Sequence, residues 1–167
     1  MEREDYQPIQ VISKFTIPVI SKFVADKGFE KKVRLPQRAT SGSAGYDFFA
    51  NEKIIINPND SVVIDTHVKA DIDEGWFLMV VPRSGLGFKY RVSLANTVGI
   101  IDSDYFSIEP EKGVVKVKLY NPGDVAIEIP KGKAFAQGIF VPFGITEDDC
   151  PASEERNGNG FGSTDKQ

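Results

Sequence analysis

Hydrophobic and polar positions along the middle of the chain follow the patterns of β-strands. Residues 54–56 and 62–64 are short apolar runs separated by an Asn-Pro-Asn-Asp turn sequence. Residues 76–81 form a continuous apolar run that stops at Pro82, which is typical of a buried strand. Over residues 115–119, valine and leucine alternate with lysine, as in a strand with one face in solvent. These patterns predict a strand at each place.

Two further strands are predicted at residues 126–129 and 135–141, each preceded by a turn sequence rich in proline and glycine. Short strands with turns about every ten residues indicate an all-β, jelly-roll-like sandwich or barrel with very little helix. Polar and apolar positions are mixed near the N-terminus, so its structure is left open. The expected organisation is an N-terminal extension of uncertain structure (1–32), a β domain (33–150) and a glycine-rich, mobile C-terminal arm (151–167).

Length and charge narrow the possible functions. A chain of 167 residues can form one domain with a sizeable core. Its 20 basic and 24 acidic residues give a formal charge of −4, which argues against a nucleic-acid or membrane-surface binder. The single cysteine excludes an internal disulfide and fits a reducing compartment. Without a signal-peptide pattern or an apolar run of about 20 residues, we expect a soluble cytoplasmic protein.

The segment after the buried strand, Pro82–Lys89, carries groups suited to phosphate. Arg83 offers a planar fork of donors that matches phosphate oxygens. The Ser84 hydroxyl and the backbone N–H groups around Gly85 suit the same oxygens, above all if a helical turn begins there. A plain turn at a strand end would require the glycines but not the arginine. The segment therefore favours phosphate binding.

A second segment, residues 96–105, places polar groups beside an apolar run. Asp102 follows that run and is expected at the rim of the core, where a fixed carboxylate could take a proton from water. The Asn96 carboxamide has the donor and acceptor needed to bind a pyrimidine edge, and Tyr105 could pack on a sugar. The alternative is a hairpin with an acidic turn, and the segment alone leaves both interpretations open.

Gln137 is the only amide in an otherwise apolar strand, within residues 132–140. A buried polar group requires a partner, so this side chain pairs either with backbone or with a ligand. The strand pattern leaves both possibilities open.

The last residues combine flexibility with ligand-binding groups. Residues 156–164 contain three glycines before Ser163, which disfavours helix or strand. Arg156 could bind phosphate, and Phe161 offers a face on which a base could stack. The extended chain between them spans about 16 Å, enough to run along a nucleoside triphosphate. The alternative is a frayed, glycine-rich terminus.

Taken together and in this order, five segments resemble the five motifs of the trimeric dUTPases, over roughly residues 33–164. They are Ala44-Gly45-Tyr46-Asp47, Pro82-Arg83-Ser84-Gly85-Leu86-Gly87, Gly99-Ile100-Ile101-Asp102-Ser103-Asp104-Tyr105, Gly132–Phe140 and Arg156–Thr164. The resemblance implies a jelly-roll sandwich, a homotrimer with active sites at subunit contacts, and hydrolysis of dUTP to dUMP and pyrophosphate with Mg²⁺. Such a reaction would lower dUTP and supply dUMP for thymidylate synthesis.

The resemblance also implies a role for each site residue. Asp102 is expected to activate the water that attacks the α-phosphorus. Asn96 and Ile101, with nearby hairpin backbone, are expected to contact uracil, and Tyr105 to pack on the deoxyribose. The phosphates are assigned to Arg83, Ser84, Gly85 and Gln137. The arm is expected to close over the triphosphate through Arg156, Gly162, Ser163 and Thr164, with Phe161 stacked on uracil.

No direct protein ligand to the metal is expected. Mg²⁺ would be held by the triphosphate and water, and Asp47 is expected to be either structural or oriented towards that water shell. The substrate and further copies of this chain are the expected partners, and a regulatory protein partner is left open.

The sequence departs from the family pattern in two places, and two alternative functions remain open. Residues 106–113 are an insertion near the sugar pocket, and the arm has asparagine where the family often has glycine. The related dCTP deaminases share the fold, but Lys118 stands where their catalytic glutamate is expected. A non-catalytic nucleotide sensor could use the same pocket. An intact set of polar site residues argues against an inactive site.

Overall fold

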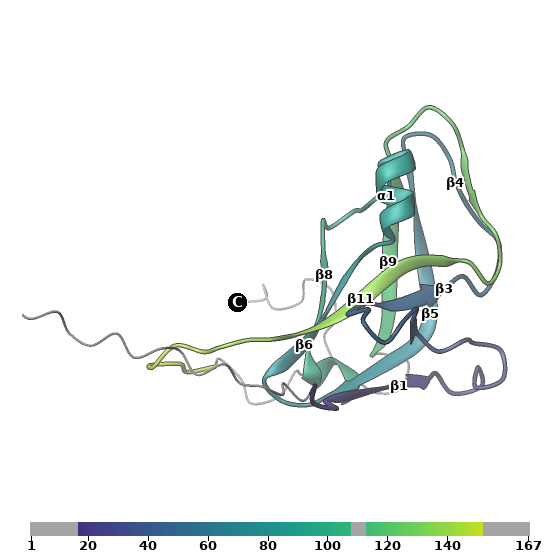
Figure 1. Cartoon of the computed structure of the whole chain (residues 1–167). Helices are drawn as coiled ribbons and strands as arrows, with labels where there is room; N and C mark the ends of the chain where they lie inside the picture. Colours follow the sequence, from purple (N-terminus) through teal and green to yellow (C-terminus); the bar gives the residue numbers. More distant parts are fainter. Residues whose placement is uncertain (1–16, 108–112, 152–167) are drawn as a thin grey trace, which may run out of the picture.

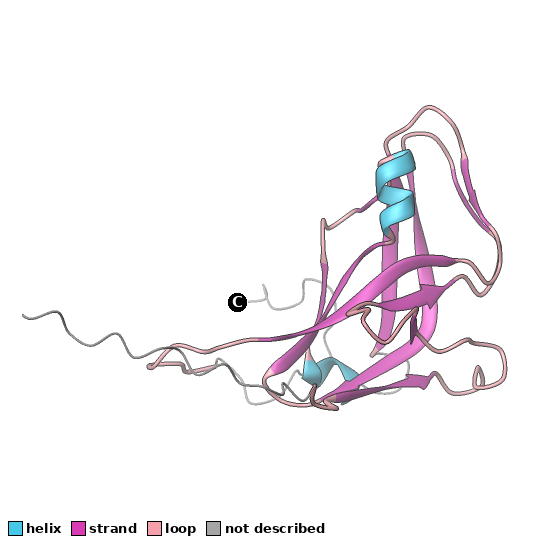
Figure 2. Ribbon diagram, in the orientation of Figure 1, coloured by secondary structure: helices cyan, strands magenta, loops and turns pink. Residues whose placement is uncertain are grey.

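Antiparallel strands dominate the computed structural model, which describes residues 17–107 and 113–151 (Figures 1 and 2). The four-stranded sheet has the order β1 (Ser21–Ala25), β5 (Asp60–Ile72), β9 (Val114–Asn121), β7 (Ser93–Leu94). The five-stranded sheet has the order β2 (Gln37–Arg38), β3 (Tyr46–Phe49), β11 (Ala134–Pro142), β6 (Trp76–Pro82), β8 (Gly99–Ile101). A separate pair joins β10 (Ile127–Ile129) to β4 (Ile54–Ile56). The helical elements of the described chain are α1 (Ser84–Tyr90) and the 3₁₀ helix η1 (Ser103–Ser107).

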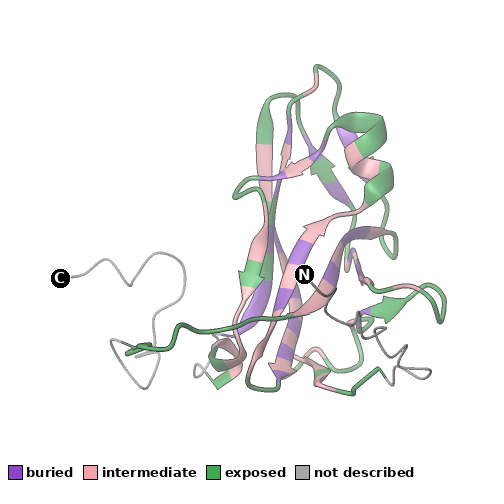
Figure 3. Ribbon diagram, turned by 60° about the vertical axis from the view of Figure 1, so that its left-hand side comes forward, coloured by how far each residue is buried: buried purple, intermediate pink, exposed green. Residues whose placement is uncertain are grey.

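One hydrophobic core joins these sheets. Apolar side chains alternate along the strands, so that one face of each larger sheet is buried (purple in Figure 3). Phe23 of β1 packs on Tyr46, Phe48 and Phe140 of the other large sheet, with ring centroids 5.3, 5.7 and 5.6 Å away. This aromatic cluster fixes β1 to the core. The expected jelly-roll-like β fold is confirmed.

The strands expected from the apolar patterns are all present, and the structure adds β1, β2, β3, β7, β8 and the helical elements α1 and η1. β1 lies within the segment left without assigned structure, and pairs with β5 from Ser21↔Ile72 to Ala25↔Val68. A helix begins at Ser84, where a helical turn was considered, and ends at Arg91 in the left-handed conformation (φ 58°). No helix in the described ranges is long and apolar enough to cross a membrane.

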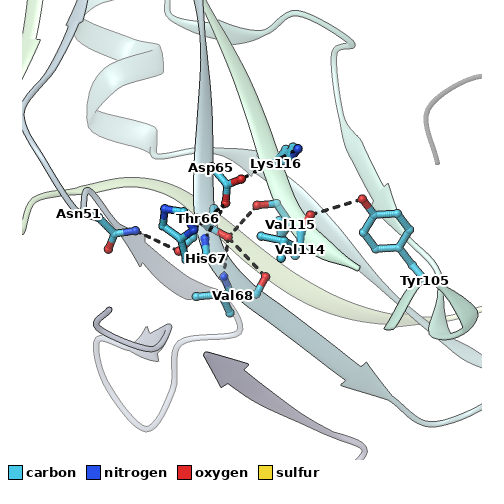
Figure 4. A network of polar contacts seen from close by, with 9 residues as sticks. All are labelled: Asn51, Asp65, Thr66, His67, Val68, Tyr105, Val114, Val115 and Lys116. Atoms are coloured by element: carbon cyan, nitrogen blue, oxygen red, sulfur yellow. Dashed lines mark hydrogen bonds and ion pairs between the residues drawn. The ribbon is translucent and has the colours of Figure 1, made fainter. Parts of the chain in front are cut away.

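A bulge in β5 divides that long strand into two halves (Figure 4). β5 pairs with β9 up to Asp65, and the register shifts before Lys69. Between them His67 adopts a positive φ of 53°, a conformation that usually requires glycine. The buried Thr66 hydroxyl donates to the Val115 carbonyl (2.7 Å) and accepts from the Val68 N–H (3.1 Å). These bonds satisfy backbone groups that the bulge removes from the ladder.

Candidate active site

Two predicted phosphate-site residues, Gln137 and Arg83, lie with Asp47 on the outer face of the five-stranded sheet. Gln137 on the central strand β11 is opposite Asp47 on β3 and opposite Val81 on β6. Directly opposed residues share one face of a sheet, and side chains alternate along each strand. Arg83 follows two residues after Val81 in extended backbone, so it belongs to the same face. The sheet thus gathers residues separated by up to 90 positions in sequence.

An ion pair connects the two flanking strands of this group. The Arg83 guanidinium donates through Nη1 to the Asp47 carboxylate. Asp47 is 8 % exposed, whereas the Arg83 side chain retains 39 % of its exposure. The carboxylate is therefore enclosed, and the guanidinium remains accessible to a ligand.

Gly45 makes room for the amide of Gln137. A Cβ atom at Gly45 would overlap the Gln137 Oε1 atom and lie 3.3 Å from its Cδ atom. Gly45 directly precedes β3, and Gln137 is paired with Asp47, so the Gln137 amide lies alongside the Asp47–Arg83 pair. Glycine at this position is a steric requirement of the polar group.

Helix α1 begins immediately beside the ion pair. Arg83 is its N-cap, and the Arg83 carbonyl accepts the N–H groups of Leu86 (3.0 Å) and Gly87 (3.1 Å). The first N–H groups of a helix have no partner within it. Those of Ser84 and Gly85, both exposed, therefore extend the donor set next to Arg83. Positive charge and N–H donors in one place suit a phosphorylated ligand.

The remaining predicted residues within the described ranges lie around β8 and η1. Asn96 is exposed in the turn between β7 and β8, which is closed by the Thr97 N–H on the Leu94 carbonyl (3.0 Å). Ile101 is half-buried opposite Leu78. A single antiparallel bridge between Leu94 and Thr97 closes this turn, which contains Asn96 and not the acidic residues, while β7 and β8 themselves pair in different sheets.

Asp102 and Tyr105 follow β8 directly. Asp102 is half-buried, and its carbonyl accepts the Tyr105 N–H (3.2 Å) that begins η1. The Tyr105 hydroxyl donates to the Val114 carbonyl (3.3 Å; Figure 4), so this ring is tethered to the start of β9. The intervening residues 108–112 lie outside the described ranges. The Asp102 backbone is thus held between β8 and η1, at the edge of the core.

A single chain does not bring Asp102 and Arg83 together. The register of β8 on β6 pairs Ile101 with Leu78, so Asp102 is level with Phe77. Arg83 is six residues further along β6, which corresponds to about 20 Å at 3.3 Å per residue. The phosphate-binding group and the Asp102 group therefore occupy opposite ends of one strand.

The described residues offer no protein cage for a metal ion. Within residues 17–107 and 113–151, no group of three or more His, Cys, Asp or Glu side chains could hold one. Asp47, the acid expected to be structural or to face the water shell of Mg²⁺, contacts Arg83.

Comparison with known proteins identifies the family of this chain. The family model for dUTPase matches residues 31–165. This chain belongs to the dUTPase family. The deoxyuridine 5′-triphosphate nucleotidohydrolase of Nautilia profundicola is 36 % identical over 143 residues, which cover 84 % of this chain and 96 % of that protein. The enzyme of the same name from Escherichia coli K12 is 36 % identical over 152 residues, covering 86 % and 95 %.

A solved dUTPase structure has the same fold. The crystal structure of the dUTPase from Streptococcus mutans superposes with a TM-score of 0.68 at 31 % sequence identity. That superposition covers 75 % of this chain and 98 % of the S. mutans chain. The strand order described above is therefore the dUTPase fold.

Some of the site residues expected from the sequence lie in the described structure, and others do not. The polar side chains expected at phosphate, Arg83 and Gln137, share a face, but the pairing of Asp47 with Arg83 and the steric role of Gly45 were missed. A glycine two residues before the aspartate is the one signal that could have suggested a close approach. The arm residues lie outside the described ranges, namely Arg156, Phe161, Gly162, Ser163 and Thr164.

Proposed function

We propose that this protein hydrolyses dUTP to dUMP and pyrophosphate, with Mg²⁺ accompanying the substrate. The observation that carries the proposal is the convergence of Arg83, Gln137 and the start of α1 on one sheet face of a dUTPase-family chain. The arginine and N–H donors match the triphosphate in charge and geometry. This activity lowers dUTP and supplies dUMP for thymidylate synthesis, and we assign it to the cytoplasm.

Asp102 is the proposed general base. Its carboxylate accepts a proton from the water that attacks the α-phosphorus, while the half-buried position at the end of β8 holds it in one place. Asn96 and Ile101 contact uracil, and Tyr105 packs against the deoxyribose. The tether from the Tyr105 hydroxyl to the Val114 carbonyl supports this role, because it fixes the ring beside Asp102.

Binding and catalysis then require residues from more than one copy of the chain. The separation of about 20 Å between the Arg83 and Asp102 positions along β6 supports a site shared between subunits. The outer face of the five-stranded sheet also carries partly exposed apolar side chains. They are Phe77, Met79, Val81, Ile100, Ile139 and Val141. We propose that this face is covered in a homotrimer, whose contacts assemble each active site.

The residues of the chain fit a cation held chiefly by the substrate. Mg²⁺ prefers oxygen ligands and keeps several waters, which triphosphate oxygens can accompany. When bound with the triphosphate, Mg²⁺ would neutralise negative charge on the phosphates. The arm residues Arg156 and Phe161 close over the nucleotide and exclude bulk water.

The decisive measurement is pyrophosphate release from dUTP with Mg²⁺, beside dCTP, dTTP and UTP. We expect release from dUTP alone. Tight binding of dUTP without release would identify a sensor. Ammonia from dCTP would indicate a deaminase, although the exposed Lys118 of β9 offers no catalytic acid. Absence of binding to all four would refute the site.

A further inference from the structure

We propose that the start of β9 positions Tyr105 for discrimination between dUTP and UTP, through the backbone of Gly113 and the carbonyl of Val114. This inference rests on the proposed function, because it deepens the role given there to the sugar pocket. Tyr105 contacts the deoxyribose, whereas Gly113 and Val114 act only through Tyr105. It starts from a buried glycine that lies against the backbone of η1.

The backbone of Gly113 is in direct contact with the end of η1. A Cβ atom at this position would lie 2.8 Å from the Tyr105 carbonyl oxygen and 2.9 Å from the Phe106 carbonyl oxygen. Both contacts are too short for a carbon atom, and both partners are backbone atoms that cannot rotate away. Gly113 also has a φ of 88°, which glycine adopts without the steric cost that other residues carry. Space and backbone angle therefore both require glycine here.

β9 is the firmly held side of this contact. Val114 pairs with β5 beyond its bulge, and the Val115 carbonyl accepts the Thr66 hydroxyl at 2.7 Å. Val114 and Val115 are both buried in the core. By contrast, η1 is a 3₁₀ helix of five residues, none of which is buried. A side chain at position 113 would therefore displace Tyr105 and leave β9 in place.

Tyr105 connects the two large sheets across this contact. Its N–H donates to the carbonyl of Asp102, directly after β8 of the five-stranded sheet (3.2 Å). Its hydroxyl donates to the carbonyl of Val114 in β9 of the four-stranded sheet (3.3 Å; Figure 4). A ring held at its backbone and at its hydroxyl has a defined position, as the wall of a selective pocket requires. The 2′-hydroxyl that such a wall excludes is the group that separates UTP from dUTP.

The ratio of kcat/KM for dUTP to kcat/KM for UTP tests this role. Gly113→Ala should lower the ratio by about tenfold or more, because small displacements of binding groups have effects of this size. The control is Gly28→Ala, which has nearly the same backbone angle (φ 85°) but meets nothing within 4 Å, and should keep the wild-type ratio. Loss of folded protein lowers both rates equally and leaves the ratio unchanged. The ratio therefore separates positioning from stability.

Tyr105→Phe provides a second test without any steric change at position 113. This variant keeps the ring but lacks the hydroxyl that bonds the Val114 carbonyl. We expect its dUTP-to-UTP ratio to fall by about two- to tenfold, the effect of losing one neutral hydrogen bond. Because both substitutions release the same ring, the double variant should lose little more than Gly113→Ala alone.

Failure of this inference is distinguishable from failure of the proposed function. A wild type that prefers dUTP, with the same ratio in an active Gly113→Ala variant, retains the proposed hydrolysis and overturns the positioning role. If Gly113→Ala does not fold, a wild-type ratio in Tyr105→Phe overturns it instead. A wild type without activity on dUTP refutes the function itself, and this inference with it.

Discussion

Two carboxylates only two residues apart allow the general-base role to be tested at a single atom. Asp102 is half-buried at the end of β8, whereas Asp104 in η1 is exposed. Asp102→Asn should lower kcat by about 10²–10⁴-fold, because the amide cannot accept the proton from water. The affinity for a non-hydrolysable dUTP analogue should change little. Single-turnover kinetics and calorimetry measure the two quantities, and Asp104→Asn is the control. A near-normal kcat for Asp102→Asn would contradict the assignment.

A methyl group at Gly45 tests the packing of the phosphate site. Gly45→Ala places a Cβ atom against the Gln137 amide and should displace it from the Asp47–Arg83 pair. We expect kcat/KM for dUTP to fall by about 10- to 100-fold, as for other small displacements of binding groups. Gly42→Ala is the matched control, since a Cβ there meets nothing within 4 Å. Equal steady-state kinetics for the two alanine variants would exclude the steric role.

The type of a residue indicates which chemistry its side chain can perform, but not which other side chain it will contact. Arg83 and Asp102 were selected because their functional groups suit phosphate and water, and that reasoning needs only local sequence. The contact between Asp47 and Arg83 arises because β11 lies between their strands. No periodicity in the sequence encodes that neighbour relation, so the sequence indicated a structural or metal-shell role for Asp47 without naming its partner.

At the scale of elements, the β5 bulge depends on the Thr66 side chain. Thr66→Val keeps the shape of the buried residue but removes the hydroxyl that bonds the Val115 carbonyl and the Val68 N–H. Leaving buried backbone groups unsatisfied should lower the free energy of unfolding by about 1–3 kcal/mol. Urea denaturation followed by tryptophan fluorescence measures this change. Thr66→Ser retains the hydroxyl and should lose less stability; if serine is as damaging as valine, the hydroxyl is not the cause.

Strands with a regular alternation of apolar and polar residues were predictable from the sequence. Elements stabilised by contacts between residues far apart in the sequence were not. The alternation at residues 115–119 gave β9 directly. β1 was missed because its burial comes from β5 and from the Phe23 aromatic cluster, both remote in sequence. The bulge was missed because its positive φ is adopted by His67. The His67 ring stacks on Phe29 with centroids 3.7 Å apart, a contact that sequence does not show.

In the whole molecule, the fold places the proposed phosphate-binding residue and the proposed general base far apart. Arg83 and Asp102 lie at opposite ends of β6, and each is fixed by bonds within its own region. Closing a distance of about 20 Å inside one chain would require breaking the β6 ladder. The homotrimer proposed above would solve the problem without any such change, because a symmetric contact would bring one copy's Asp102 to another copy's Arg83.

Mixing two inactive variants tests this shared site directly. Arg83→Ala and Asp102→Asn should each be nearly inactive alone, since every site lacks one group. In trimers assembled from equal amounts of both, a site that takes each group from a different subunit has both intact in about a quarter of cases. We therefore expect co-refolded mixtures to recover up to about a quarter of wild-type turnover, while separately refolded samples combined afterwards stay inactive. Recovery would also disappear if the double variant Arg83→Ala/Asp102→Asn replaced either partner. Mixed trimers of confirmed mass without recovered activity would mean that each site draws both groups from one chain.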